Sequence, residues 1–175
     1  MKDKLRVLIS EEEVSRRIRE MAGQISRDYE GKELRIVCVL KGGVFFMCEL
    51  AKHITVPVTF DFMAVSSYGN GHESSGALQI VKDLDESVEG KDILVVEDIV
   101  DSGNTLSRLL TLLKERNPKS LRLCTLLDKP ERRETEVPVD YTGFLVPNLF
   151  VVGYGMDDAQ YYRNLPYIAV VEQEE

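Results

Sequence analysis

The sequence predicts an α/β fold with a mainly parallel central sheet flanked by helices. Short apolar runs alternate with amphipathic helical patterns, several of these runs are apolar almost throughout, and polar turns that contain glycine follow them. Strands that are apolar on both faces are typical of parallel sheets covered by helices. A chain of 175 residues that is 43% hydrophobic can bury one substantial core, so residues 1–175 are expected to form a single domain.

The first expected element is an amphipathic helix. Ser10 and Glu13 have the spacing of a capping box, which marks a helix start. The apolar residues that follow at helical spacing are Val14, Ile18, Met21, Ala22 and Ile25. This pattern stops near Gly31, so the helix is expected to bury one face and to end before that glycine.

Strand and helix patterns then alternate along the chain. LRIVCVL (34–40) is nearly all apolar and rich in β-branched residues, which indicates a buried strand, and GGVFFMCELAKHI after it has the pattern of a loop and then a helix. The other expected strands are 56–65, 78–84, 92–99, 120–127 and 149–154. A stripe of leucines, followed by Pro118, predicts a helix over 105–116: Leu106, Leu109, Leu110 and Leu113.

One long polar insert interrupts this alternation. The segment 66–77, SSYGNGHESSGA, is too long for a tight hairpin and is rich in glycine and serine. Composition alone leaves two interpretations open, a functional loop or a plain connection.

Composition and charge exclude several classes of protein. No run of 18 apolar residues occurs, and the opening residues MKDKLRVLISEEE are too charged for a signal peptide. The formal net charge of −8 argues against broad binding to nucleic acid or to a membrane surface. The chain has three cysteines, an odd number, and all of them lie in apolar segments: Cys38, Cys48 and Cys124. Buried reduced thiols are therefore expected. We therefore expect a cytoplasmic protein with no nucleic-acid or membrane partner.

Three carboxylates lie close together in VVEDIVDSGNTL (95–106). Glu97 and Asp98 fall at the carboxyl end of the expected strand, where open α/β sheets bind ligands, and Asp101 follows them. Neighbouring acids repel one another, so a partner is needed to offset them. The bland alternative is that Glu97 and Asp98 only cap and solvate the end of a strand.

The turn after these acids suggests an anion site. Residues 102–105 supply a glycine, two hydroxyls and the free N–H groups of a helix start, which together attract a phosphate. The carboxylates would then face hydroxyls or a divalent cation. A sugar phosphate presents both kinds of group, so it is the ligand that this stretch predicts.

The same stretch resembles the ribose-phosphate motif of the purine phosphoribosyltransferases, specifically their hypoxanthine-guanine branch. LKGG (40–43), SSYG (66–69), LLDKP (126–130) and FVVGYGMDDAQYYRNLPYIAVV (150–171) resemble further segments of that family in the same order. The resemblance implies a phosphoribosyltransferase-like sheet with a small base-binding hood built from the N- and C-terminal segments. It also implies transfer of the phosphoribosyl group of phosphoribosyl pyrophosphate to hypoxanthine or guanine, giving IMP or GMP and pyrophosphate.

The resemblance assigns a role to each matched residue. Asp101 is expected to be the general base for the purine ring proton, and Glu97 and Asp98 are expected to hold the ribose hydroxyls. The residues expected at the 5′-phosphate are Asp101, Ser102, Gly103, Asn104 and Thr105. Those expected at pyrophosphate are Lys41, Gly42, Gly43 and Arg163, with a cis peptide bond between Leu40 and Lys41. Those expected at the purine are Lys129, Phe150, Val151 and Met156.

The implied cofactor is Mg²⁺, with Glu97, Asp98 and Asp157 as its expected ligands. Ser67 and Tyr68 are expected to belong to a lid over residues 66–77.

Several of these residues have ordinary alternatives. KGG alone is compatible with a plain strand-to-helix turn, Phe150 with core packing, and Lys129 with a solvated side chain. His53 and His72 have no matching ligand partners and receive no catalytic role.

Two questions of function stay open at this level. A regulator that keeps this fold and binds RNA or DNA is the main competing class, which net acidity, Asp101 and Lys129 disfavour. The sequence does not rank hypoxanthine, guanine and xanthine. The resemblance implies a homodimer or homotetramer without choosing between them.

Overall fold

The main sheet of the computed structural model has the predicted parallel architecture. The structure describes residues 4–67 and 77–172. Six strands lie in the order β4-β3-β2-β5-β6-β7, and only the β3–β4 pair is antiparallel. Their bounds are β2 Leu34–Val39, β3 Val58–Ser67, β4 Leu78–Lys82, β5 Asp92–Val100, β6 Ser120–Asp128 and β7 Tyr141–Leu145. The central strand β5 places its carboxyl end between those of β2 and β6.

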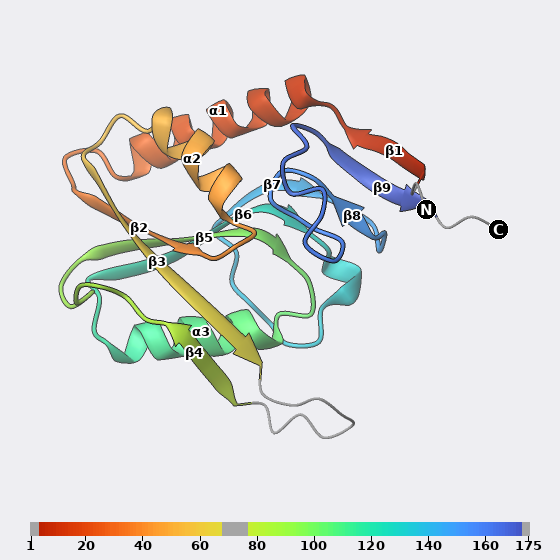
Figure 1. The fold of residues 1–175 in the computed structure, drawn as a ribbon. Helices are drawn as coiled ribbons and strands as arrows, with labels where there is room; N and C mark the ends of the chain where they lie inside the picture. Colours follow the sequence, from red (N-terminus) through yellow and green to blue (C-terminus); the bar gives the residue numbers. More distant parts are fainter. Residues whose placement is uncertain (1–3, 68–76, 173–175) are drawn as a thin grey trace.

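Helices cover both faces of this sheet (Figure 1). The helices α1 (Glu11–Asp28) and α2 (Val44–Lys52) pack on one face, and α3 (Asn104–Glu115) packs on the other. Each face has its own apolar core, which explains why β2 and β5 are apolar almost throughout. A 3₁₀ turn, η1 (Pro130–Arg132), follows β6.

The first helix confirms the sequence prediction. Ser10 is its N-cap, and the Ser10 Oγ accepts a hydrogen bond of 3.2 Å from the backbone N–H of Glu13. All five predicted apolar residues are buried on one face of α1, and the helix ends at Asp28, before Gly31. Local capping and helical periodicity were therefore sufficient to predict it.

A second, three-stranded antiparallel sheet joins the two ends of the chain. Strand β1 (Lys4–Ile9) pairs with β9 (Ile168–Glu172), which pairs with β8 (Val151–Val152). This is the expected hood of N- and C-terminal segments, and Figure 1 shows it beside the ends of β5 and β6. The strand expected over 149–154 is shorter, because the backbone turns at Gly153, whose φ is +96°. The strand assignments from sequence missed β1, β7 and β9.

The cysteines are free, but they are not all buried. Cys38 and Cys124 lie in the core, where burial raises the pKa of both thiols, that of Cys38 to about 12. Cys48 is exposed, so the expectation of burial was wrong for this residue. It lies on the outward face of α2, whose inward face is formed by Phe46, Met47 and Leu50.

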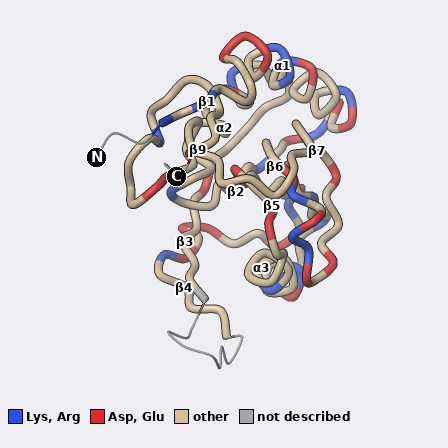
Figure 2. Tube along the Cα trace, turned by 90° about the vertical axis from the view of Figure 1, so that its right-hand side faces the viewer, with Lys and Arg blue, Asp and Glu red and all other residues tan. Residues whose placement is uncertain are grey.

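Charge is mixed over the surface. Figure 2 shows acidic and basic segments interspersed along α1 and around the strands β5 to β7. Within residues 4–67 and 77–172, no helix is both long and apolar enough to cross a membrane.

Candidate active site

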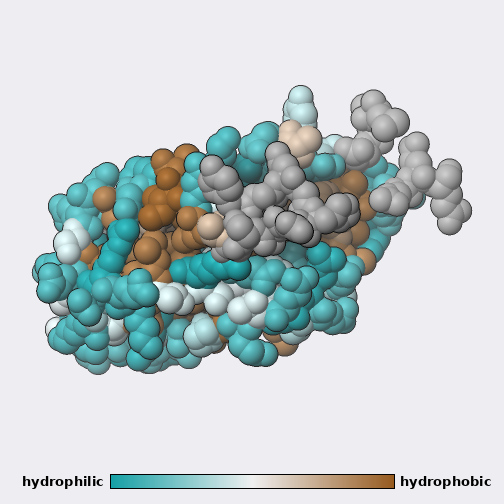
Figure 3. Space-filling view, turned by 90° about the horizontal axis from the view of Figure 1, so that it is seen from below, coloured by the Kyte–Doolittle hydropathy of each residue, from teal (hydrophilic) through white to brown (hydrophobic). Residues whose placement is uncertain are grey.

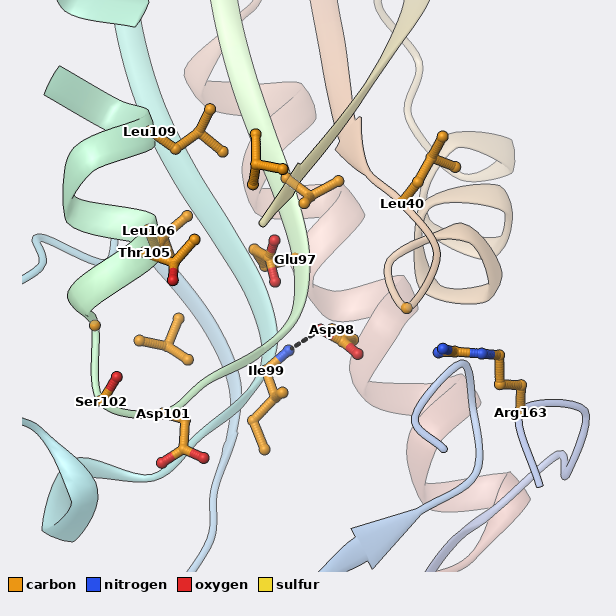
Figure 4. A pocket seen from close by; sticks show the side chains of 15 residues that line it. Leu40, Glu97, Asp98, Ile99, Asp101, Ser102, Thr105, Leu106, Leu109 and Arg163 are labelled. Carbon is orange, nitrogen blue, oxygen red and sulfur yellow. Dashed lines mark hydrogen bonds between the residues drawn. The ribbon is translucent and has the colours of Figure 1, made fainter. Parts of the chain in front are cut away.

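A cavity of about 340 Å³ lies at the carboxyl ends of β2 and β5. Its walls come from the loop after β2, the end of β5, the turn before α3, the first turns of that helix, and Arg163 from the C-terminal part of the chain. The predicted site residues that line it are Gly42, Glu97, Asp98, Asp101, Ser102, Gly103, Thr105 and Arg163. The fold therefore brings the ribose, phosphate and pyrophosphate candidates together around one space (Figure 4).

The two carboxylates of β5 are held in an unfavourable environment. Burial, and then the neighbouring charge of Asp98, raise the pKa of Glu97 well above its usual value. Burial also raises the pKa of Asp98, although hydrogen bonds from Glu97 and from the backbone N–H of Ile99, at 2.8 Å, oppose that rise. Hydroxyl donors or a divalent cation would relieve the repulsion between these two buried carboxyls. This arrangement disfavours the alternative of a solvated strand end.

The loop after β2 closes over Asp98. The peptide bond between Leu40 and Lys41 is cis, as the resemblance implied. A Cβ atom added to Gly42 would lie 2.0 Å from Asp98 Oδ2, so any other residue at this position would force the loop or the Asp98 carboxylate to move. Glycine at position 42 is therefore explained by this contact with Asp98.

The turn before α3 has the geometry of an anion-binding helix start. Gly103 is its N-cap, with φ +82°, and the Ser102 Oγ accepts the backbone N–H of Asn104 at 3.3 Å. The next N–H groups of a helix have no acceptor within the helix, so they are available to a phosphate. Thr105 lines the cavity, as Figure 4 shows.

A second segment, which sequence reasoning missed, holds this turn in place. The backbone N–H groups of Glu134 and Thr135 both donate to the Ser102 carbonyl, at 2.9 and 3.1 Å. A Cβ on Gly103 would overlap the Thr135 carbonyl oxygen, because the backbone of Gly103 packs closely against this segment. Asn104 donates to the Glu134 carboxylate at 2.7 Å, so its side chain serves the turn itself.

Asp101 forms hydrogen bonds with two arginines. Arg132 Nε donates to Asp101 Oδ1 at 3.2 Å, and Arg133 Nε donates to the Asp101 carbonyl at 3.2 Å. Figure 4 shows the Asp101 carboxylate pointing away from Glu97. The only sequence signal for these arginines was their position after the LLDKP segment.

Arg163 lies across the cavity from these groups. Figure 4 shows its guanidinium reaching toward Asp98. Its Nη1 donates to the Gly155 carbonyl at 2.6 Å, and its Nη2 lies 3.3 Å from Asp157 Oδ1. Its Nε is buried and has no hydrogen-bond partner among the described residues.

The purine candidates lie outside the lining of this cavity. Lys129 is buried at the end of β6, and burial lowers the pKa of its ammonium. Phe150 is 54% exposed, so the core-packing alternative is wrong and its ring is accessible. Val151 and Met156 are buried, and the backbone N–H and carbonyl of Met156 are both hydrogen-bonded to Gly153.

The remaining candidates are only partly described. Lys41 and Asp157 do not line the cavity. Lys41 is linked to Arg163 through the side-chain oxygen of Gln160, whereas Asp157 pairs with Arg163 directly. Ser67 ends β3, opposite Leu78. Tyr68 and His72 lie outside the described residues. His53 follows α2 and is exposed.

The donor set suits magnesium in part. Among the described residues, no three His, Cys, Asp or Glu side chains are arranged to hold a metal ion. Mg²⁺ is usually bound by one or two carboxylates together with substrate oxygens, and Glu97 and Asp98 supply such a pair. Asp157 is committed to Arg163 and to the backbone N–H of Gln160, at 2.8 Å, so it would bind a metal only indirectly.

Comparison with known proteins identifies a family. The model of the phosphoribosyl transferase domain matches residues 9–159. A hypoxanthine phosphoribosyltransferase of Salmonella typhimurium is 51% identical over 98% of this chain and 97% of that protein. A hypoxanthine-guanine phosphoribosyltransferase of Bacillus subtilis is 51% identical over 95% of this chain and 93% of that protein. A crystal structure of a hypoxanthine-guanine phosphoribosyltransferase from Bacillus anthracis has a TM-score of 0.92 at 48% identity, covering 98% of this chain and all of that one.

Other relatives are longer. The chain is 54% identical to the bifunctional protein TilS/HprT of Listeria monocytogenes, and the match covers 97% of this chain. It spans only about a quarter, 26%, of that protein's length.

Proposed function

This chain belongs to the phosphoribosyl transferase family, and from that premise we propose that it is a purine-salvage enzyme. It transfers the phosphoribosyl group of phosphoribosyl pyrophosphate to hypoxanthine or guanine, giving IMP or GMP. The observation that carries the proposal is one cavity that holds the paired carboxylates of β5, the anion-binding turn before α3 and the guanidinium of Arg163. Residues 1–175 act in it as one catalytic domain.

The ribose 5-phosphate is bound at both of its ends. Its hydroxyls donate to Glu97 and Asp98, whose pKa values are raised chiefly by burial, so the sugar supplies donors that these buried carboxyls need. Its 5′-phosphate accepts hydrogen bonds from the turn 102–105 and from the first N–H groups of α3. Binding the sugar at two points fixes the direction of its anomeric carbon.

Proton transfer is assigned to Asp101. The purine nitrogen forms the new bond to the anomeric carbon while the bond to the pyrophosphate oxygen breaks, and the ring proton passes to Asp101. For this step the carboxylate has to exchange its contact with Arg132 for one with the base. The negative charge that develops on pyrophosphate is stabilised by Lys41 and Arg163. The planar guanidinium of Arg163 can bind two phosphate oxygens at once.

Magnesium is the proposed cofactor. Glu97 and Asp98 would hold it together with substrate oxygens, which fits the carboxylate pair that the structure shows. When bound, the metal supplies positive charge that favours departure of pyrophosphate.

Lys129 is proposed to select 6-oxopurines. Its ammonium donates to the 6-oxygen of hypoxanthine or guanine, whereas the 6-amino group of adenine would present donor to donor. The exposed ring of Phe150 is available to stack on the base.

A steady-state assay with all four purine bases tests this function. With phosphoribosyl pyrophosphate and Mg²⁺, we expect turnover of hypoxanthine and guanine, little turnover of adenine, and loss of activity with a chelator. Turnover of adenine equal to that of hypoxanthine would contradict the role of Lys129. Absence of pyrophosphate release with every base would refute the proposed reaction.

We also propose a cytoplasmic, self-associating enzyme. Free thiols at Cys38, Cys48 and Cys124 fit a reducing compartment. Apolar side chains gather on the surface in Figure 3, and a hollow of about 510 Å³ between α2 and β3 is lined largely by such side chains, including Met47 and Phe60. Light scattering of the wild type and of Phe60→Glu tests whether this surface joins two copies: a dimer or tetramer that Phe60→Glu dissociates is expected, and a wild-type monomer would refute it.

A further inference from the structure

Gln160 joins the two cations assigned to pyrophosphate. Its side-chain oxygen Oε1 accepts from Lys41 Nζ at 3.3 Å and from Arg163 Nη2 at 3.2 Å. Lys41 comes from the loop after β2, whereas Gln160 and Arg163 lie more than a hundred residues later. A single amide oxygen thus lies between two positive groups from distant parts of the chain.

The backbone holds Gln160 in an unusual conformation. Its φ is +73° and that of Ala159 is +48°, in the left-handed region that non-glycine residues rarely adopt. The Gln160 N–H donates to Asp157 Oδ2 at 2.8 Å, and the other oxygen of that carboxylate pairs with Arg163. This local network fixes the loop around Gln160 and Arg163, and backbone strain of this kind is commonly found at functional sites.

The charge on the bridging atom has a consequence for ligand binding. Lys41 and Arg163 repel each other, and the partial negative charge of the amide oxygen offsets that repulsion without neutralising either cation. An anionic oxygen of a diphosphate would interact with both groups more strongly than a neutral amide does. A carboxylate at position 160 would instead compete with the ligand.

We propose that Gln160 is a positioning residue which keeps Lys41 and Arg163 converged around one oxygen position until a pyrophosphate oxygen replaces the amide. The inference rests on the proposed function, because that function assigns the two cations to pyrophosphate. It adds that residue 160 has to be both an acceptor and neutral. Sequence reasoning did not single out this residue.

Direct binding of magnesium pyrophosphate tests the inference without catalysis. Isothermal titration is compared for the wild type, Gln160→Met and Gln160→Glu, with Gln24→Glu as the matched control. Gln24 is exposed on α1, so its change adds the same charge away from the site. Binding of IMP, which does not reach the pyrophosphate position, is measured in parallel, together with the melting temperature of each protein.

Each substitution has its own expected effect. Gln160→Met keeps a side chain of similar length but removes the acceptor. It should weaken pyrophosphate binding about 2- to 10-fold, the cost of ordering one free side chain. Gln160→Glu should weaken it by ~10-fold or more, because like charges then meet in the site. Gln24→Glu should bind pyrophosphate as the wild type does, and IMP binding should change less than about 2-fold in all variants, within the effect of one surface substitution.

The outcomes separate this inference from the proposed function. Wild-type affinity for pyrophosphate in both Gln160 variants would overturn the role of Gln160 and leave the proposed function intact. A parallel loss of IMP binding and of melting temperature would also overturn it, because it would indicate a merely structural role. A wild-type protein that binds no pyrophosphate would overturn the proposed function and this inference together.

Discussion

Gly42→Ala should inactivate the enzyme while leaving its fold in place. The added Cβ would lie 2.0 Å from Asp98 Oδ2, about 1.4 Å short of ordinary van der Waals contact. Either the loop 40–43 or the Asp98 carboxylate has to move by about that distance. Misplacement by ~1 Å at a reacting centre can reduce the rate by ~10²-fold, so we expect kcat/KM for phosphoribosyl pyrophosphate to fall at least that far.

The control is Gly23→Ala on α1. A Cβ there meets only Arg27 Nη1, at 3.5 Å, which is ordinary contact. Alanine in a helix is favoured over glycine by about 0.5–1 kcal/mol, so this variant should be fully active and slightly more stable. Steady-state kinetics and thermal melting are measured on both proteins. A Gly42→Ala enzyme with more than half of the wild-type kcat/KM would refute the idea that the close approach of residue 42 to Asp98 matters.

Three further predictions concern other parts of the molecule. Asp101→Asn should lower kcat by ~10²-fold or more with little change in the affinity for phosphoribosyl pyrophosphate, and near-normal kcat would exclude Asp101 as the base. Asp83→Asn tests a surface ion pair in which two hydrogen bonds of 2.8 Å from Arg116 lower the pKa of Asp83. Because the folded-state pKa is the lower one, the pair stabilises the fold above the ordinary aspartate pKa of about 3.9, and this contribution disappears as the pH falls through the folded-state value. The groups are partly exposed, so urea unfolding at pH 7 should show a loss of about 0.2–1 kcal/mol that vanishes in acid; a loss that persists in acid would contradict this origin. Tyr29→Phe should raise the free energy of unfolding by ~1 kcal/mol, because the Tyr29 hydroxyl is buried without a partner among the described residues, and a decrease in urea titrations would show that the hydroxyl is satisfied.

Part of the site was predictable because its residues are consecutive in the sequence. The stretch 95–106 contains a strand end, its acids and a helix start, so local patterning placed Glu97, Asp98 and the turn 102–105 on one wall of a cavity. The resemblance to a known family then supplied the residues of distant segments and the cis bond after Leu40. The roles of these residues stay predictions until they are tested.

The sequence by itself determined the elements that local patterns define: α1 from its capping box and apolar face, the strands of the main sheet other than β7 from their apolar runs, and the acid-rich strand end with its helix start. Only the tertiary structure decided which distant groups meet there. It placed Arg132 on Asp101, Gly42 against Asp98, and Gln160 between Lys41 and Arg163. The physical reason is range: capping and periodicity depend on neighbours within a turn or a strand, whereas these contacts depend on how the strands and the hood pack around one cavity.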